Sequence, residues 1–202
     1  MPTIAVANLK GGVAKTTTTV GLAACLSRVG STIVVDLDSQ RQAVNWAQRV
    51  GGMIPLEAVT ATAHSLDEVL AQRSGSHQWA VVDTPPGDVE SVRAAMTAAD
   101  VVVIPMSPTI LDVERIAPTI RLLGEVEADG VDRPFTALLV RARAGTNAIR
   151  EARNALGTYG VPVLTGVVPL REGIAQGFRK SSDLDAYLVP TQEIRQLLEA
   201  SP

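Results

Sequence analysis

The stretch ANLKGGVAKTTTT, which occupies residues 7–19, decides how this chain folds. It nearly matches the phosphate-binding pattern G-x-x-x-x-G-K-[ST], but Leu9 and Ala14 stand where that pattern has glycine. An apolar run precedes the stretch, and Lys15 and Thr16 open a helical pattern after the glycine pair. A strand, a glycine turn and a helix in that order point backbone N–H groups at an anion. We therefore expect a phosphate-binding loop here.

Each residue type in this loop suits that chemistry. Gly11 and Gly12 let the backbone approach a ligand closely, and Lys15 supplies a point charge for the β and γ phosphates. The Thr16 hydroxyl is a ligand for Mg²⁺. Ala14 leaves one question open: alanine costs about 1 kcal/mol there if the backbone needs a positive φ, and little if it does not.

The remainder of the chain alternates strands with helices. Seven short apolar runs predict strands buried on both faces, because they are nearly continuous rather than alternating. They cover residues 3–8, 32–36, 56–60, 79–83, 101–105, 135–140 and 163–168, with stretches of helical period between them. This order predicts an α/β fold in which a mostly parallel, twisted sheet carries helices on both faces and binds ligands at the carboxyl ends of its strands. We see no linker, so we expect one domain over residues 1–202.

Composition excludes several classes of protein. The net charge of -3 argues against a generally basic nucleic-acid binder, although it leaves room for a local basic patch. One cysteine, Cys25, permits neither an internal disulfide nor a cysteine metal cluster. The chain has no apolar run of the length that spans a membrane and no leader pattern, so we expect a cytoplasmic protein.

Lys10, the lysine that the general pattern does not ask for, makes the identification of the loop more specific. Residues 10–16 spell K-G-G-x-x-K-[ST], which resembles the deviant Walker A loop of the ParA/MinD family of ATPases, a class of P-loop NTPases. In that family the first lysine reaches across a dimer to the partner's phosphates, so the resemblance implies an ATP-dependent homodimer and a catalytic Lys10. A solvated loop lysine is the alternative. The resemblance also implies that ATP contacts Lys10, Gly11, Gly12, Val13, Ala14, Lys15, Thr16 and Thr17.

Two acidic segments complete the resemblance. Residues 35–40, VDLDSQ, match the family's D-x-D-x-Q segment, which implies that Asp36 positions or activates water and contacts the metal. Asp38 then supports the metal or the dimer face, or merely caps the next helix. Residues 80–87, AVVDTPPG, resemble the Walker B strand and its switch, which implies that Asp83 holds Mg²⁺ together with Thr16. Lys10, Lys15 and Asp36 are thus the expected catalytic residues.

The later part of the chain gives weaker signals. Residues 103–108, VIPMSP, resemble a segment near the family's dimer interface, and an ordinary strand end explains them equally well. Arg141 occupies a place where relatives contact the nucleotide base, and Pro169 and Leu170 match the later base-contacting turn. Arg141 either stacks on adenine or is a surface residue.

Taken together, the motifs imply a slow Mg-ATP-dependent ATPase closest to the small ParF-like plasmid partition proteins. Such a protein is stimulated by a centromere-binding ParB- or ParG-like partner and binds nucleoid DNA without sequence preference. The candidate DNA contacts, for which a solvated helical face is the alternative, are Arg143, Arg150, Arg153, Arg171, Arg179 and Lys180. The C-terminal stretch 191–202 is short and not basic, so membrane docking is not expected.

The sequence leaves two rival functions open. The first is a related switch that positions a protein cargo instead of DNA. The second is a biosynthetic ligase of the same superfamily, which activates a small carboxylate with ATP. A switch is nearly idle without its partner, whereas a ligase turns over without a macromolecule.

Overall fold

The structure is a computed structural model that describes residues 1–51, 53–143 and 145–200. Gly52, Ala144, Ser201 and Pro202 lie outside the described residues, so the predicted domain limit at residue 202 does too. Within the described ranges, six parallel strands form one sheet in the order β3-β2-β4-β1-β5-β6. Their bounds are β1 Thr3–Val6, β2 Thr32–Asp36, β3 Glu57–Thr60, β4 Trp79–Asp83, β5 Val101–Met106 and β6 Phe135–Leu139.

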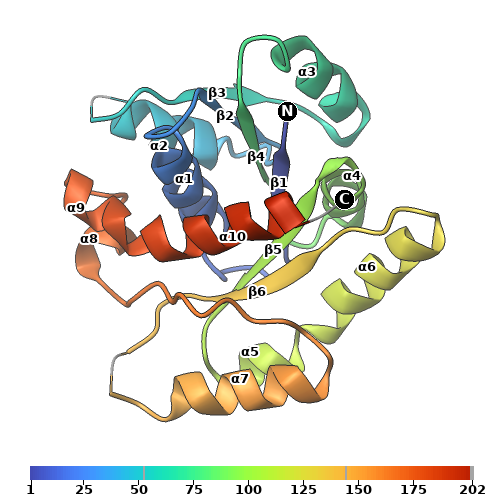
Figure 1. Cartoon of the computed structure of the whole chain (residues 1–202), viewed down its shortest axis with the longest axis vertical. Helices are drawn as coiled ribbons and strands as arrows, with labels where there is room; N and C mark the ends of the chain where they lie inside the picture. The colour runs from blue at the N-terminus through green and yellow to red at the C-terminus, as the bar shows by residue number, and fades with distance from the viewer. Residues whose placement is uncertain (52, 144, 201–202) are drawn as a thin grey trace.

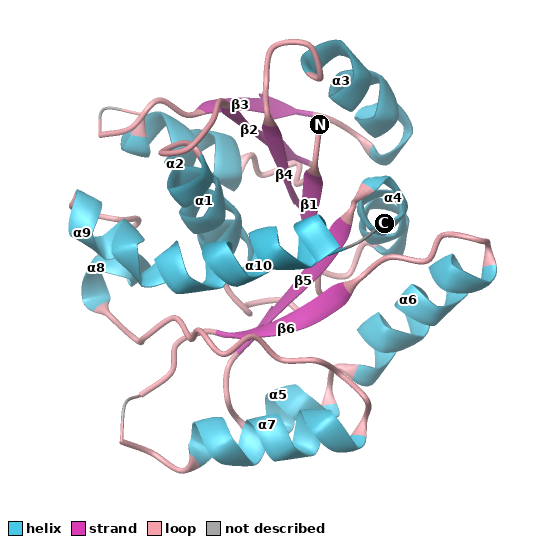
Figure 2. Ribbon diagram, viewed as in Figure 1, coloured by secondary structure: helices cyan, strands magenta, loops and turns pink. Residues whose placement is uncertain are grey.

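Helices cover both faces of this sheet, as the sequence predicts (Figures 1 and 2). Successive residues of a strand point to opposite faces, so Ile4 packs in one apolar cluster and Ala5 in the other. The first cluster lies under α1 (Lys15–Leu26), α2 (Gln42–Val50), α8 (Glu172–Ala175), α9 (Ser181–Leu184), η2 (Asp185–Tyr187) and α10 (Leu188–Ala200). The second lies under α3 (Leu66–Arg73), α4 (Val89–Ala98), α5 (Ile110–Glu114), α6 (Ala117–Ala128) and α7 (Ala148–Thr158), with the short turn η1 (Ala63–Ser65) before α3.

The parallel register gathers the chain's polar motifs at one edge of the sheet. Val6 lies beside Asp83, and Asp83 lies beside Asp36, so three strands end at the same level. The phosphate-binding stretch leaves β1 at that level and enters α1. Because all strands run in the same direction, the loops that follow them gather at one edge of the sheet, where ligands bind in folds of this kind.

The seventh predicted strand, residues 163–168, does not form. Isolated bridges join this region to that of β6, between Ala137 and Val163 and between Ala142 and Pro169, and the Leu164 and Val168 N–H groups donate to the Ala137 and Leu139 carbonyls at 3.0 and 2.9 Å. In the middle, the Glu193 carboxylate on α10 accepts hydrogen bonds from the backbone N–H groups of Thr165 and Gly166, at 2.6 and 2.9 Å. A side chain therefore occupies the donors that a strand would have given to its neighbour.

The prediction that every strand is buried on both faces is wrong for β3. This strand is at the edge of the sheet, where Glu57 and Thr60 are exposed and Ala58 and Val59 are half-buried. β3 pairs with β2 alone, whereas β6 at the other edge has the segment 163–168 beside it and is buried from Thr136 to Leu139. The interior strands β1, β2 and β5 are buried along their whole length.

Candidate functional site

The loop between β1 and α1 is held in shape by Asn8. Its side-chain amide donates to the carbonyl of Pro105 on β5 at 3.0 Å, and its side-chain oxygen accepts from the Lys10 N–H at 2.9 Å. The Thr119 hydroxyl of α6 donates to that same oxygen at 3.2 Å and accepts the Leu9 N–H. Asn8 and Thr119 are buried, so the loop is fixed from beneath and its outer side is left for a ligand.

The open question at Ala14 is answered by the backbone. Ala14 has a φ of 64° and a ψ of 35°, the left-handed conformation that glycine adopts more easily, and Gly12 has a φ of 75°. Ala14 is the residue before α1, and no side chain caps the first N–H groups of that helix. These groups stay available to an anion, as the sequence pattern requires.

Thr16 and Asp83 meet at the start of α1. The Thr16 hydroxyl donates to Oδ2 of Asp83 at 2.8 Å, and the Thr19 hydroxyl one turn later donates to Oδ1 at 2.9 Å. Asp83 is fully buried, and this burial raises the pKa of its carboxyl to about 7, although both hydroxyl hydrogen bonds oppose the shift. Sequence reasoning predicted the first pair and missed Thr19.

The Thr16 hydroxyl and the Asp83 carboxylate are suitable ligands for a magnesium ion. A hydroxyl and a carboxylate are hard oxygen ligands, and Mg²⁺ is usually held by one or two carboxylates with phosphate and water oxygens completing its shell. In the part of the chain that the structure describes, no three His, Cys, Asp or Glu side chains are grouped to hold a metal ion on their own. An ion beside Thr16 and Asp83 would therefore depend on the oxygens of a bound phosphate.

Asp36, which ends β2, and Asp38, which follows it, differ in their surroundings. Asp36 is buried, and its two carboxylate oxygens accept the backbone N–H groups of Asp38 at 2.9 Å and Val44 at 3.2 Å. Asp38 is half-buried and lines the cavity next to the loop, whereas Asp36 does not. Burial also raises the pKa of the Asp36 carboxyl, which the backbone hydrogen bonds partly offset. Asp36 thus supports the turn after β2, and Asp38 is the acid of this pair that borders the cavity.

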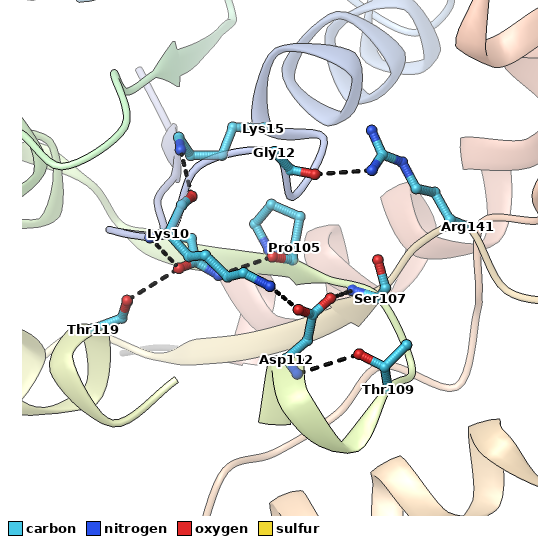
Figure 3. Close-up of polar contacts among 10 residues, drawn as sticks. Lys10, Gly12, Lys15, Pro105, Ser107, Thr109, Asp112, Thr119 and Arg141 are labelled. Atoms are coloured by element: carbon cyan, nitrogen blue, oxygen red, sulfur yellow. Dashed lines mark hydrogen bonds and ion pairs between the residues drawn. The ribbon is translucent and has the colours of Figure 1, made fainter. Parts of the chain in front are cut away.

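Lys15 and Lys10 point in different directions (Figure 3). The Lys15 ammonium is buried and donates to the Lys10 carbonyl at 3.0 Å, and its burial lowers its pKa against the opposing effects of Asp83 and Asp38. The Lys10 ammonium turns away from the cavity and forms an ion pair with Asp112 on α5. Nothing in the sequence motifs pointed to Asp112.

A cavity of about 410 Å³ opens beside the loop. Most of the predicted nucleotide contacts line it, namely Gly12, Val13, Ala14, Lys15, Thr16, Thr17, Arg141, Pro169 and Leu170. Lys10, Gly11, Asp36 and Asp83 are outside the lining. The structure adds Gln42, Trp46, Ile174 and Tyr187, which come from segments that carry no motif. Trp46 and Tyr187 are aromatic residues in a chain that has few of them, which is a weak signal in the sequence. Gln42 and Ile174 carry no such signal.

Arg141 lines this cavity and contacts the phosphate-binding loop. It follows β6 in a left-handed conformation with a φ of 54°, and its guanidinium donates to the Gly12 carbonyl at 2.8 Å (Figure 3). The open alternatives for Arg141 were a base contact and a plain surface residue. Arg141 is exposed, lines the cavity and bonds to the loop, so the base contact stays a prediction.

The basic residues predicted to contact DNA do not gather in one place. Arg150 and Arg153 are on α7, which lies well apart from α8 and α9 in Figure 1. Arg171 directly precedes α8, and Arg179 and Lys180 lie between α8 and α9. Arg153 donates to the Thr165 carbonyl at 2.8 Å, and Arg171 lines the nucleotide-sized cavity. Arg143, Arg150, Arg179 and Lys180 are exposed and stay predictions. Across the described ranges, none of the helices has the length and apolar character needed to span a bilayer.

Comparison with known proteins gives a consistent picture. A family model described as the CobQ/CobB/MinD/ParA nucleotide binding domain matches residues 4–182. The Maintenance of carboxysome distribution protein A of Gloeobacter kilaueensis is 34% identical over 166 residues, which cover 82% of this chain and 75% of that protein. Protein ParA of Rhizobium radiobacter is 32% identical over 145 residues, which cover 69% and 64%.

A solved structure shares the fold. Cobyrinic acid a,c-diamide synthase from Mycobacterium smegmatis, with bound ATP analog and magnesium, superposes with a TM-score of 0.81 at 20% identity, over 99% of this chain and 96% of that one. At this level of identity the likeness concerns the course of the backbone, which agrees with the α/β fold predicted from the alternation of strands and helices.

Proposed function

The chain belongs to the CobQ/CobB/MinD/ParA family of nucleotide-binding domains, and on that premise we propose that it is a Mg-ATP-dependent ATPase of ParA type that dimerises around ATP. The single observation that carries the proposal is the loop itself. Two lysines flank a glycine pair, the following helix has a free N-terminus, and the Thr16 hydroxyl is bonded to a buried carboxylate. This set of groups suits a triphosphate with its metal ion.

At the phosphate end, we assign binding to Lys15 and the first N–H groups of α1. Lys15 already donates to a backbone oxygen, so its ammonium sits where a phosphate oxygen could replace that carbonyl. Thr16 and Asp83 would hold magnesium, which supplies charge neutralisation for the transferring phosphoryl group. We assign ATP contacts to residues 10–17, as the motif implies; in a single chain the Lys10 side chain pairs with Asp112 instead.

For hydrolysis, we assign the water-positioning carboxylate to Asp38 and not to Asp36. Asp38 borders the cavity and accepts one backbone N–H, from Gln40 at 2.9 Å, whereas Asp36 is buried and each of its oxygens accepts a backbone N–H. A group that orients water needs a free acceptor within reach of the substrate. Asp36 then acts indirectly, by holding the turn on which Asp38 stands.

At the nucleoside end, Arg141, Pro169 and Leu170 border the same cavity, and Trp46 adds an aromatic face. These side chains suit a flat base that needs stacking and one or two polar contacts. Trp46 is itself packed edge to face against Phe178, with ring centroids 6.0 Å apart. A rigid aromatic wall is therefore present before any ligand binds.

Dimerisation rests on Lys10 and on α5. Ile110 and Leu111 of α5 are 63% and 59% exposed, beside the residue that pairs with Lys10. Exposed apolar side chains next to a nucleotide site are typical of a surface that a second copy covers. In the dimer, Lys10 would contribute its charge to the triphosphate of the other subunit, which offsets the repulsion between two bound nucleotides.

The biological role is proposed as partition of a plasmid or chromosome in the cytoplasm, on the nucleoid, with a ParB- or ParG-like partner. A second candidate is positioning of a protein cargo, which the likeness to the carboxysome distribution protein favours. Nonspecific DNA binding through the exposed Arg143, Arg150, Arg179 and Lys180 serves both roles. Loss of the gene should raise plasmid loss in the first case and misplace a protein assembly in the second.

The proposal is tested by sizing the purified protein with light scattering in ADP and then in ATP with Mg²⁺. We expect a monomer in ADP and a dimer in ATP, with Lys15→Ala binding no ATP and Lys10→Ala binding it but staying monomeric. Phosphate release measured with and without DNA and partner separates a switch from a ligase. A rate of phosphate release that DNA and partner leave unchanged, and that a small carboxylate raises, would favour the ligase.

A further inference from the structure

In the isolated chain, the Lys10 side chain is held by its own subunit. Its ammonium pairs with the Asp112 carboxylate on α5, and the two side chains are 26% and 11% exposed. Figure 3 shows the Lys10 side chain extending toward Asp112, away from the Lys15 ammonium. The loop thus separates its two lysines, one toward the phosphate cavity and one toward α5.

Both partners of this ion pair are fixed by other contacts. The Asp112 Oδ2 accepts the Ser107 N–H at 3.3 Å, and the Asp112 N–H is bonded to the Thr109 hydroxyl at 3.2 Å in the first turn of α5. The Lys10 backbone is held by Asn8 from below. Asp112 is therefore in place before the pair forms, and the entropy cost of pairing falls mainly on the Lys10 side chain.

From this contact we infer that Asp112 positions Lys10 inside its own subunit and competes with the triphosphate of a second copy for the lysine's charge. The inference rests on the proposed function, because it concerns the step in which Lys10 crosses the dimer interface. Asp112 is the anion that a phosphate oxygen has to replace. It is therefore a positioning residue that sets how much ATP is needed to form the dimer.

The location of Asp112 supports this competition. It is preceded by Ile110 and Leu111, which are exposed, so the segment that retains Lys10 is also the segment available to a second copy. A half-buried ion pair of opposite charges loses its attraction when one partner leaves, and the gain from a triphosphate has to exceed that loss. A single chain without ATP then has its Lys10 charge neutralised internally.

The test uses Asp112→Asn, which removes the charge and keeps an oxygen for the Ser107 N–H. Light scattering would follow dimer formation as ATP is increased in Mg²⁺, and a fluorescent ATP analogue would report binding at protein concentrations too low for dimers. We expect the ATP concentration at half-dimerisation to fall about threefold to tenfold, the effect of an ion pair of this exposure. Monomer affinity for the nucleotide should stay unchanged.

Glu114→Gln is the matched control, because it removes the same charge from the same helix at an exposed residue. It should leave the half-dimerisation point where it is. Because Lys10→Ala is expected to stay monomeric, the double variant is followed by thermal unfolding. With the ion pair already removed, Asp112→Asn should cause no further change, whereas a role of Asp112 within α5 alone would lower the unfolding temperature in either background. Asp112→Ser serves as a second variant if the amide destabilises α5, and thermal unfolding reports that.

The outcomes separate this inference from the proposed function. If wild type dimerises with ATP and Asp112→Asn needs the same ATP concentration or more, the competition is overturned while the ATPase proposal stands. If Asp112→Asn dimerises and wild type does not, the competition is stronger than expected and both proposals are supported. If both proteins stay monomeric in ATP, the dimer mechanism fails and the role of Asp112 fails with it.

Discussion

The Thr16 hydroxyl donates a hydrogen bond to Asp83 at 2.8 Å, which ties the first turn of α1 to the end of β4. The carboxylate that receives it is fully buried, and its pKa is raised to about 7. The residue expected to hold magnesium is therefore close to half-protonated near neutral pH when no ligand is bound. This gives the site a measurable dependence on pH.

The first prediction concerns stability without ligand. Between pH 3.8 and about 7 the folded chain keeps a proton on Asp83 that the unfolded chain has released, so stability falls as pH rises through this window and levels off above it. Asp83→Asn should remove this pH dependence of stability, because an amide does not titrate in this range. The amide can still form hydrogen bonds with both threonine hydroxyls, so the variant should fold. Thermal unfolding at several pH values checks it, and an equal slope in the two proteins would contradict it.

A second prediction follows from the left-handed backbone at Ala14, whose φ is 64°. Ala14→Gly should raise the free energy of unfolding by up to about 1 kcal/mol, because glycine has no steric cost in this conformation. The control is Ala71→Gly in α3, exposed and helical, which should lower it by about 1 kcal/mol. Urea unfolding of the three proteins measures the difference, and a destabilised Ala14→Gly would show that the loop adopts another conformation.

The third prediction separates the two aspartates after β2. Asp36→Ala leaves the Asp38 and Val44 N–H groups without their acceptor, so the free energy of unfolding should drop by about 1–3 kcal/mol. Asp38→Ala should leave stability nearly unchanged, bind ATP, and slow phosphate release at least about tenfold, the lower range for loss of a positioned proton acceptor. Urea unfolding and single-turnover phosphate release provide the measurements.

If Asp36→Ala were as stable as wild type and inactive, the role predicted from the sequence would hold and the assignment to Asp38 would be wrong.

A fourth prediction concerns Arg141, which donates to the Gly12 carbonyl at 2.8 Å and lines the cavity. Arg141→Ala should weaken ATP binding by about tenfold, the value of one charge-assisted hydrogen bond. Arg143→Ala, two residues later, removes the same charge from an exposed residue that does not line the cavity, and should leave ATP affinity unchanged. Isothermal titration of both variants decides the matter, and equal losses would indicate a general effect of charge.

Much of the fold can be predicted from local patterns in the sequence. The apolar runs before Asn8, Asp36 and Asp83 predicted central strands, because residues buried on both faces leave a continuous apolar signal. The segment 163–168 carries a similar signal but does not form a continuous strand: its ends donate to β6, whereas the Glu193 carboxylate from α10 accepts the Thr165 and Gly166 N–H groups in the middle. An interaction across that distance in the chain leaves no trace in the pattern of the segment itself.

The sequence by itself determined the chemistry of the phosphate loop and the order of the carboxylates that follow the strands, because these depend on residue type and spacing. Only the tertiary structure decided where each charge points. Asp36 and Asp38 are two residues apart and face different surroundings, and Lys10 finds Asp112 on a helix that carries no motif. Side-chain direction follows from the packing of distant segments against one another, and that packing is what the linear order of residues leaves open.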